Sequence, residues 1–64
     1  MNNIGEKIRY ERLKKRLKQY ELAQKSGISN TFLSDVEVGR TMPSIKTMEK
    51  IAKALELSIK DFLD

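Results

Sequence analysis

The sequence contains neither cysteine nor histidine, and this absence removes several classes of site at once. Without these residues there is no disulfide and no thiolate ligand, and the ordinary zinc frameworks are excluded. Nucleophilic pairs of the Ser-His or Cys-His type are excluded as well. A chain of 64 residues must then depend on helix packing, because a domain of this size buries only about 60% of its unfolded surface. We predict no metal site and no cofactor.

Long hydrophobic runs are also lacking. No stretch approaches the roughly 20 apolar residues of a membrane span, and the N-terminus has no apolar segment of the signal-peptide kind. We therefore expect a cytoplasmic protein without a membrane partner. Acidic residues are in the minority, with 9 Asp and Glu against 13 Lys and Arg, and the net charge is +4. A basic balance suits a polyanionic partner such as nucleic acid or an anionic membrane surface.

Proline and glycine are scarce, and no window alternates apolar and polar residues as a strand does. Apolar residues instead recur at helical spacing. We predict an all-α fold of five short helices in a single domain over residues 1–64. The expected helices run from about Ile4 to Lys15, from Gln19 to Ser26, from an N-cap at Ser29 to Val38, from an N-cap at Ser44 to Leu55, and from a capping box at Ser58 through Leu63.

Two of these helices have a recognisable apolar side. In the first helix the inward residues are predicted to be Ile4 and Ile8 and, less regularly, Leu13 and Leu17. In the fourth helix the same reasoning selects one face, formed by Ile45, Met48, Ile51, Ala52 and Leu55.

The stretch from Gln19 to Gly39 carries the functional signal. Two short helices meet there at a tight turn, where Gly27 supplies a positive φ and Ile28 is placed to fill the corner. This is the layout of a helix-turn-helix, over about residues 19–38, whose second helix lies in the DNA major groove.

On a helical wheel of about 100° per residue, the third helix has one side of short polar groups and an opposite apolar side. The polar side chains are those of Asn30, Thr31, Ser34 and Asp35, with Val38 on the same side, and the opposite side chains are those of Phe32, Leu33 and Val36. Short polar groups can approach base edges without blocking the groove. The same pattern is also typical of any amphipathic surface helix, so the wheel alone does not decide between the two.

Several motifs, in order, resemble the lambda-repressor-like, or XRE-type, helix-turn-helix family. They are Gln19-Tyr20-Glu21-Leu22-Ala23, Ser26-Gly27-Ile28-Ser29, Leu33-Ser34-Asp35-Val36-Glu37-Val38-Gly39-Arg40 and Pro43-Ser44. The resemblance extends from Ile4 to Leu63. It implies a compact five-helix fold, no cofactor, and sequence-specific binding of double-stranded operator DNA by a bacterial or phage transcriptional regulator, typically a repressor acting as a dimer.

The resemblance also implies roles for individual residues. The base-reading positions correspond to Asn30, Thr31, Ser34 and Asp35, and the phosphate-contacting positions to Gln19, Arg40 and Thr41. The family fold further implies a salt bridge between Arg12 of the first helix and Glu37 of the third. For Gln19 and Arg40 the plainer interpretations are a helix-start residue and a solvated cation.

Three residues depart from the family pattern. Lys18 stands where a capping Ser, Thr or Asn is usual, so the second helix is expected to lack a side-chain cap. Arg16 stands where glycine often ends the first helix, which implies backbone strain there. Asp35 is an acid on a face that should approach DNA, and this leaves its role in base contact open.

Three other functions compete with DNA binding. The basic run from Arg9 to Lys18 could lie on a membrane surface, but it lacks bulky aromatic anchors. The same fold could instead be a protein-interaction module, such as an antitoxin that acts on a partner protein. An enzyme is the weakest alternative, because the carboxylates have no phosphate loop or metal spacing around them, and we predict no small-molecule substrate.

We expect a weak homodimer, formed around Leu57, Ile59 and the last helix, in some cases only on DNA.

Overall fold

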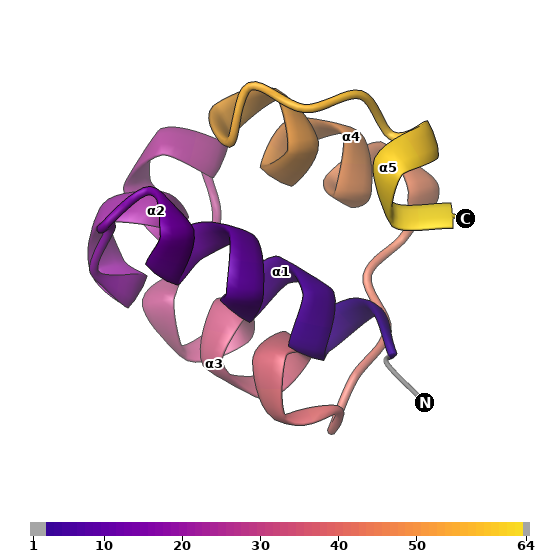
Figure 1. The fold of residues 1–64 in the computed structure, drawn as a ribbon. Coiled ribbons are helices and arrows are strands. Elements are labelled where there is room, and N and C mark those ends of the chain that lie inside the picture. The colour runs from indigo at the N-terminus through magenta and orange to yellow at the C-terminus, as the bar shows by residue number, and fades with distance from the viewer. Residues whose placement is uncertain (1–2, 64) are drawn as a thin grey trace.

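In the computed structural model, residues 3–63 are described, and they form five helices with no strand among them. The helices are α1 (Ile4–Lys14), α2 (Gln19–Ser26), α3 (Asn30–Val38), α4 (Ile45–Ala54) and α5 (Lys60–Leu63). The predicted all-α, five-helix architecture is confirmed, with helix bounds close to those expected. Figure 1 shows α1 lying across α3, with α4 and α5 on the other side of α1.

Local hydrogen bonds explain where the helices begin. Asn3 accepts from the backbone N–H of Glu6 at 2.8 Å, and the Glu6 carboxylate accepts from the N–H of Asn3 at 3.3 Å, which is a complete capping box. The hydroxyls of Ser29 and Ser44 accept from the N–H three residues later, at 3.0 and 3.1 Å. The N–H of Ser58 donates to the carboxylate three residues later at 2.9 Å. Short polar side chains thus fix most helix starts, as the sequence predicts.

The first four helices all end in the same way, on one residue in the left-handed region. At the ends of α2 and α3 that residue is a glycine, Gly27 (φ 71°) or Gly39 (φ 86°). At the ends of α1 and α4 it is Arg16 (φ 59°) or Glu56 (φ 62°). In each case the following N–H donates back to a carbonyl five residues earlier, at 2.8 to 3.1 Å, which is the Schellman pattern. The strain expected at Arg16 is therefore present, and Glu56 repeats it.

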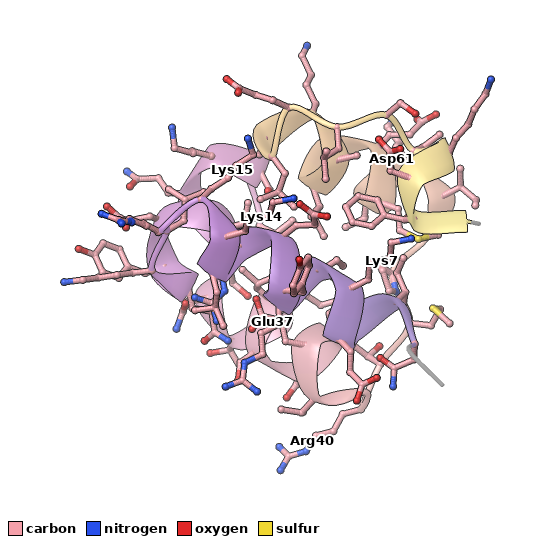
Figure 2. The ribbon with its side chains drawn as sticks, in the orientation of Figure 1. Lys7, Lys14, Lys15, Glu37, Arg40 and Asp61 are labelled. Atoms are coloured by element: carbon pink, nitrogen blue, oxygen red, sulfur yellow. The ribbon has the colours of Figure 1, made fainter. Side chains whose placement is uncertain are left out.

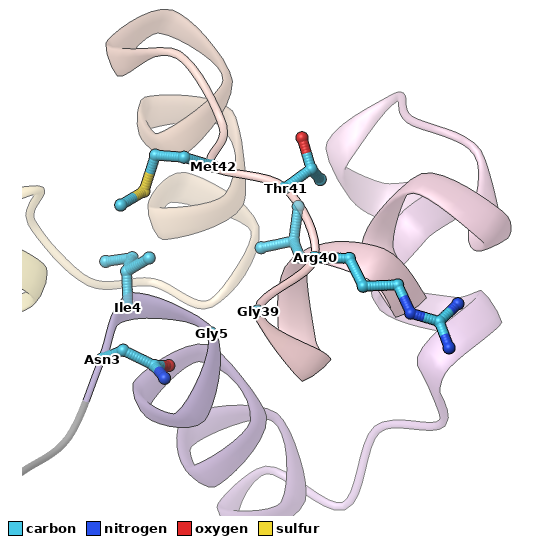
Figure 3. Close-up of a pocket in the computed structure, with 8 residues that line it drawn as sticks. Asn3, Ile4, Gly5, Gly39, Arg40, Thr41 and Met42 are labelled. Atoms are coloured by element: carbon cyan, nitrogen blue, oxygen red, sulfur yellow. The ribbon is translucent and has the colours of Figure 1, made fainter.

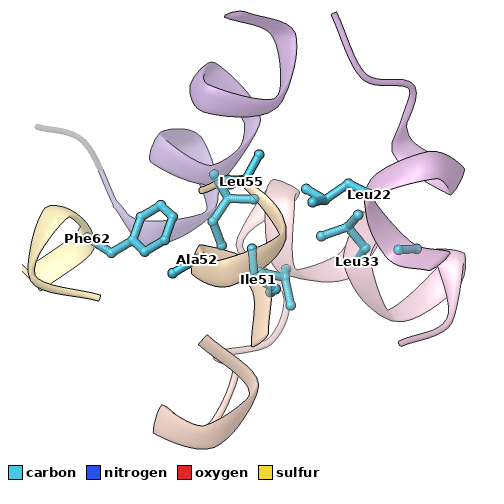
Figure 4. Packing of buried hydrophobic residues seen from close by; sticks show 9 residues of the cluster. Leu22, Leu33, Ile51, Ala52, Leu55 and Phe62 are labelled. Atoms are coloured by element: carbon cyan, nitrogen blue, oxygen red, sulfur yellow. The ribbon is translucent and has the colours of Figure 1, made fainter. Parts of the chain in front are cut away.

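The core is formed by residues from all five helices, because α1 packs on α3, α2 on both α3 and α4, and α5 on α1. Figure 4 shows Leu22 and Leu33 meeting Ile51 and Leu55, with Phe62 of α5 covering one end. The buried members of this cluster are Ile8, Leu22, Ala23, Leu33, Val36, Ile51, Ala52, Leu55 and Phe62. The predicted inward faces of α3 and α4 thus meet each other through α2.

Two predicted core residues are exposed instead. Leu13 is 54% exposed, because the spacing that buries Ile8 brings Arg12, one turn later, to the inner side of α1 and leaves Leu13 facing outward. Ile45 is 56% exposed although it shares the angular position of Ala52, since it lies in the first turn of α4 at the edge of the core. Angular position alone therefore overestimates burial at a helix end.

Gly5 is the point of closest approach between α1 and α3. A Cβ placed on Gly5 would collide with the carbonyl oxygen of Val36 and would lie 2.9 Å from the carbonyl oxygen of Glu37. Only glycine lets the two backbones come this close without displacing α3. The position of α3 on α1 thus depends on a missing side chain.

Candidate nucleic-acid interface

The solvent-facing side of α3 carries the four residues proposed to read bases. Asn30 and Thr31 are exposed in its first turn, and Ser34 and Asp35 are half-buried one turn later. Because the opposite side of α3 is held in the core, these four side chains stand on a helix that cannot rotate. A row of short hydrogen-bonding groups on a rigid helix has the chemistry needed to read base edges.

Arg40 and Thr41 follow directly after α3. The side chain of Arg40 is 78% exposed, and its guanidinium reaches away from the body of the protein in Figure 2, while Thr41 is half-buried. One guanidinium nitrogen lies 3.6 Å from the carboxylate of Asp35. The acid that departs from the family pattern is therefore paired within the chain, and this contact was not foreseen from the sequence.

A shallow pocket of about 340 Å³ lies beside this loop, between the start of α1 and the end of α3. Figure 3 shows the side chains of Ile4 and Met42 facing each other across it, whereas the Arg40 side chain extends away from it. Arg40 is one of the lining residues, but its guanidinium points away from the cavity and contacts Asp35 on the α3 side.

The start of α2 offers unpaired backbone donors. Lys18 occupies the N-cap position and its side chain has no acceptor atom, so the helix has no side-chain cap. Among residues 3–63, the N–H groups of Gln19 and Tyr20 have no hydrogen-bond acceptor. The Glu21 carboxylate reaches back to the N–H of Lys18 at 2.7 Å, which leaves the two N–H groups uncovered. Free N–H groups beside a lysine at a helix start form a site suited to phosphate.

A buried ion pair lies next to this site, between α1 and the end of α3. Arg12 Nε donates to Glu37 Oε2 at 2.7 Å, and Arg12 Nη2 donates to Glu37 Oε1 at 3.0 Å, in a bidentate arrangement. The two side chains are 10% and 2% exposed. The pair expected from the family fold is therefore present, and Figure 2 shows Glu37 lying between α1 and α3.

The Arg12–Glu37 pair also holds Gln19. The Gln19 amide donates to Glu37 Oε1 at 3.2 Å, and Arg12 Nη1 donates to the carbonyl oxygen of Leu17 at 2.9 Å. We call these four residues the Arg12 network. It fixes the turn before α2 and the first residue of α2 against the end of α3. The candidate phosphate site and the candidate reading helix are thus tied to one carboxylate, whereas the family resemblance implied only the Arg12–Glu37 pair.

Further basic and apolar groups lie along the chain near Arg40, and the sequence assigned none of them a role in DNA contact. Lys46 is exposed in the first turn of α4, which begins at the Ser44 cap. Val38, Met42 and Ile45, which flank Arg40 along the chain, are 66%, 71% and 56% exposed. The exposure of Ile45 was not predicted, because its spacing placed it on the inner face of α4, and the exposure of single apolar residues depends on where neighbouring helices end. Together these residues show that the chain around Arg40 is more apolar than a charge count suggests.

Within residues 3–63 no group of three or more metal-ligating side chains is close enough to hold an ion. In the same part of the chain, no helix has both the length and the apolar character required to cross a bilayer.

Comparison with known proteins agrees with this geometry. A family model described as helix-turn-helix matches residues 8–62. The ImmF control region 10 kDa protein of Bacillus phage phi105 is 45% identical over 56 residues, which make up 88% of this chain and 62% of that protein. The chain thus spans about three fifths of the length of that relative.

Two solved structures with DNA have the same fold. One is SinR, the master regulator for biofilm formation, in complex with DNA: it is 37% identical with a TM-score of 0.90, covering 95% of this chain and 98% of that one. The other is the P22 c2 repressor protein in complex with a synthetic operator: it is 31% identical with a TM-score of 0.89, covering 97% of this chain and 94% of that one.

Proposed function

Because the chain belongs to the lambda-repressor-like helix-turn-helix family, we propose that it binds double-stranded operator DNA and represses transcription in a bacterium or phage. The observation that carries this proposal is the polar side of α3, held rigidly between the uncapped start of α2 and the exposed Arg40. The DNA-bound relatives support the mode of binding. The chain covers only part of its phage relative, so the proposal concerns the DNA-binding module.

The base-reading side chains are those of Asn30, Thr31, Ser34 and Asp35. The Asn30 amide is exposed at the start of α3 and has the donor and acceptor that pair bidentately with adenine. Thr31 offers a hydroxyl and a methyl group, the latter suited to a thymine. Asp35, when ionised, accepts from the amino group of cytosine. Its carboxylate lies 3.6 Å from a guanidinium nitrogen of Arg40, which reduces the repulsion that an acid on this face would have for DNA phosphates.

The phosphate-contacting groups are those of Gln19, Arg40 and Thr41. The amide nitrogen of Gln19 carries two hydrogens, and its bond to Glu37 uses one of them. The second hydrogen, together with the free N–H groups at the start of α2, is available to a phosphate oxygen. The Arg12 network then acts as a support, because it orients the amide without using all its donors.

Two copies are needed for a useful operator, since one reading helix contacts few base pairs. We propose a weak homodimer in which the two α3 helices enter successive major grooves about 34 Å apart. Leu57 and Ile59, which precede α5 and are half-buried, supply the remaining apolar surface for this contact. Ile59→Asp should then shift binding on a two-fold operator from cooperative to independent half-sites. Full-affinity binding of a single half-site by the unmodified protein would contradict this assembly.

The proposal describes a binding protein and not an enzyme, with operator DNA as its partner and the DNA-containing bacterial cytoplasm as its place of action. Its direct test is selection of bound sequences from a random duplex pool. We expect the unmodified chain to enrich a two-fold-symmetric site. Asn30→Ala should cost about 1–3 kcal/mol on that site and relax the preference at one base pair.

Two further variants sharpen this test. Asp35→Ala should change the preferred sequence, whereas Arg40→Ala should weaken binding to all sequences about equally, because phosphates carry no base information. Lys53→Ala, at an exposed position near the end of α4, is the matched control and should change neither. If Asn30, Thr31 and Asp35 can each become alanine without altering the selected sequence, α3 does not read DNA and the proposal fails.

A further inference from the structure

A second pocket lies at the opposite end of α2 from Gln19. It has a volume of about 550 Å³ and is formed where the C-terminal ends of α2 and α4 lie side by side, as Figure 1 shows. Its lining includes Lys25, Ser26, Gly27, Lys50 and Lys53. None of the groups assigned to DNA contact takes part in it. An eight-residue helix is about 12 Å long, so the pocket is separated from the start of α2 by roughly that distance.

The charged side chains that line this pocket are all positive. Lys25, Lys50 and Lys53 are exposed, and none of them joins a salt bridge to another residue in the range 3–63. No carboxylate from that range lines the pocket. Lys50 and Lys53 are three residues apart on α4, so they lie on the same face of that helix. Three exposed lysines around one pocket, with no carboxylate of residues 3–63 among its lining residues, favour a ligand that carries negative charge.

Ser26 gives an independent indication of a ligand. It is only 4% exposed, and among the described residues its hydroxyl is a buried side-chain group with no hydrogen-bond partner. A buried hydroxyl without a partner is unfavourable, and native proteins rarely leave one so. Ser26 is among the residues that line the pocket, so a ligand bound there lies beside this residue and can supply the missing acceptor once the hydroxyl turns outward.

The pocket also contains backbone carbonyl oxygens that lack a hydrogen-bond donor in the described part of the chain. Within residues 3–63 the carbonyl oxygens of Lys25 and Ser26, the last two of α2, accept no hydrogen bond. Both pocket helices also present their C-terminal, partly negative ends here. A compact phosphate would meet these carbonyl oxygens, whereas a peptide offers carboxylates to the lysines and N–H groups to the carbonyls. The arrangement therefore suits an extended acidic peptide better than an inorganic anion.

We propose that the pocket between the ends of α2 and α4 binds an acidic segment of a partner protein. This second interaction is separate from DNA binding and uses none of its residues. It would let a partner dock on the regulator while the reading face of α3 remains on the operator.

The test uses the whole ¹⁵N-labelled chain with a hexaglutamate peptide as the probe, followed by amide NMR. We expect saturable shifts at Lys25, Ser26 and Gly27 and along residues 50–54. Lys50→Gln/Lys53→Gln should weaken peptide binding about tenfold, because two surface ion pairs are lost. The matched control, Lys14→Gln/Lys60→Gln, removes the same charge from exposed sites outside the pocket and should leave the affinity within about twofold. Shifts confined to the starts of α2 and α3 would overturn the proposal.

Ser26→Ala separates a ligand role from a structural one. It removes a hydroxyl that has no partner in the fold, so the melting temperature should not fall, while peptide affinity should drop about threefold. A lower melting temperature with unchanged peptide affinity would overturn the role given to Ser26 and with it the proposal. Inorganic phosphate that produces the same shifts as tightly as the peptide would replace it with a small-anion site.

Operator binding is measured in parallel. It should be unchanged in Lys50→Gln/Lys53→Gln, and a loss as large as that caused by Arg40→Ala would make the pocket part of the DNA interface instead. Failure of operator binding in the unmodified chain would overturn the proposed function alone, since the peptide titration does not depend on it.

Discussion

The carboxylate of Glu37 accepts hydrogen bonds from Arg12 of α1 and Gln19 of α2 while being almost completely buried. Glu37→Gln keeps the shape of the side chain but strands the Arg12 charge. Removing one partner of a buried pair typically costs about 3–5 kcal/mol. At roughly 4–8 °C per kcal/mol for a domain of this size, the thermal midpoint should fall by more than about 10 °C.

Glu49→Gln is the control for this prediction, because it makes the same chemical change at an exposed position of α4. Its midpoint should stay close to that of the unmodified chain. An unchanged midpoint in Glu37→Gln would mean that the pair contributes no more than a solvated one. A loss of stability with retained operator affinity would show that the Arg12 network supports the fold without orienting Gln19.

Gly5 gives a second prediction at the scale of the residue. A Gly→Ala change inside a helix ordinarily stabilises by about 0.5–1 kcal/mol. Here the new methyl group would press on the carbonyl oxygens of Val36 and Glu37, so Gly5→Ala should instead destabilise by about 1–3 kcal/mol. Urea unfolding measures the difference, with exposed Arg9→Ala on α1 as the neutral comparison. A more stable Gly5→Ala variant would mean that α3 yields to the methyl group.

Among the helices, α2 combines a weak start with a proposed ligand site. Lys18→Ser should add the missing cap and stabilise the fold by about 1 kcal/mol. The same change removes a cation and covers N–H groups that face the proposed phosphate, so operator affinity should fall several-fold. Thermal melts and fluorescence anisotropy with operator DNA measure the two effects on one sample. Lys53→Ser makes the same replacement at an exposed position near the end of α4 and should weaken DNA binding little. If Lys18→Ser strengthens binding, α2 does not hold a phosphate.

Helix bounds were predictable because they depend on local chemistry. Ser29 and Ser44 cap the helices that follow them, and Gly27 and Gly39 end the helices before them, all through contacts within a few residues. The side assigned to Leu33 and Val36 was predictable as well, since helical spacing fixes it.

What the sequence could not supply are contacts made across the fold. The Gln19–Glu37 hydrogen bond joins residues 18 positions apart, and neither spacing nor charge indicates it. The Asp35–Arg40 contact depends on how the loop leaves α3. The exposure of Ile45 depends on where the neighbouring helices stop. The residue roles proposed for DNA recognition came from the family resemblance. The structure adds the hydrogen bond and the ion pair that hold some of these residues in place.

For the molecule as a whole, DNA affinity should depend on salt in a way that separates the two groups of residues. Binding to the operator should weaken by about 0.9 log unit per log unit of salt for each phosphate neutralised. Arg40→Ala should reduce that slope by about one, whereas Asn30→Ala should lower affinity at every salt concentration and leave the slope unchanged. Titrations between about 50 and 200 mM salt cover the useful range. Salt-independent binding of the unmodified chain would rule out phosphate contacts as its main source.

The left-handed turns at Arg16 and Glu56 are positions at which the thermal stability of the molecule can be raised by substitution. Each holds a side chain in a conformation that costs on the order of 1 kcal/mol and that glycine adopts freely. The two turns lie close together, since the Nζ of Lys15, next to Arg16, is 3.6 Å from Glu56 Oε1. Neither turn is on the polar side of α3. Arg16→Gly and Glu56→Gly are therefore expected to stabilise the fold and to compensate for destabilising substitutions elsewhere. Variants with less favourable residues on the polar side of α3 are expected to regain the lost stability from these two changes, so that side of α3 tolerates more substitution than the small core suggests.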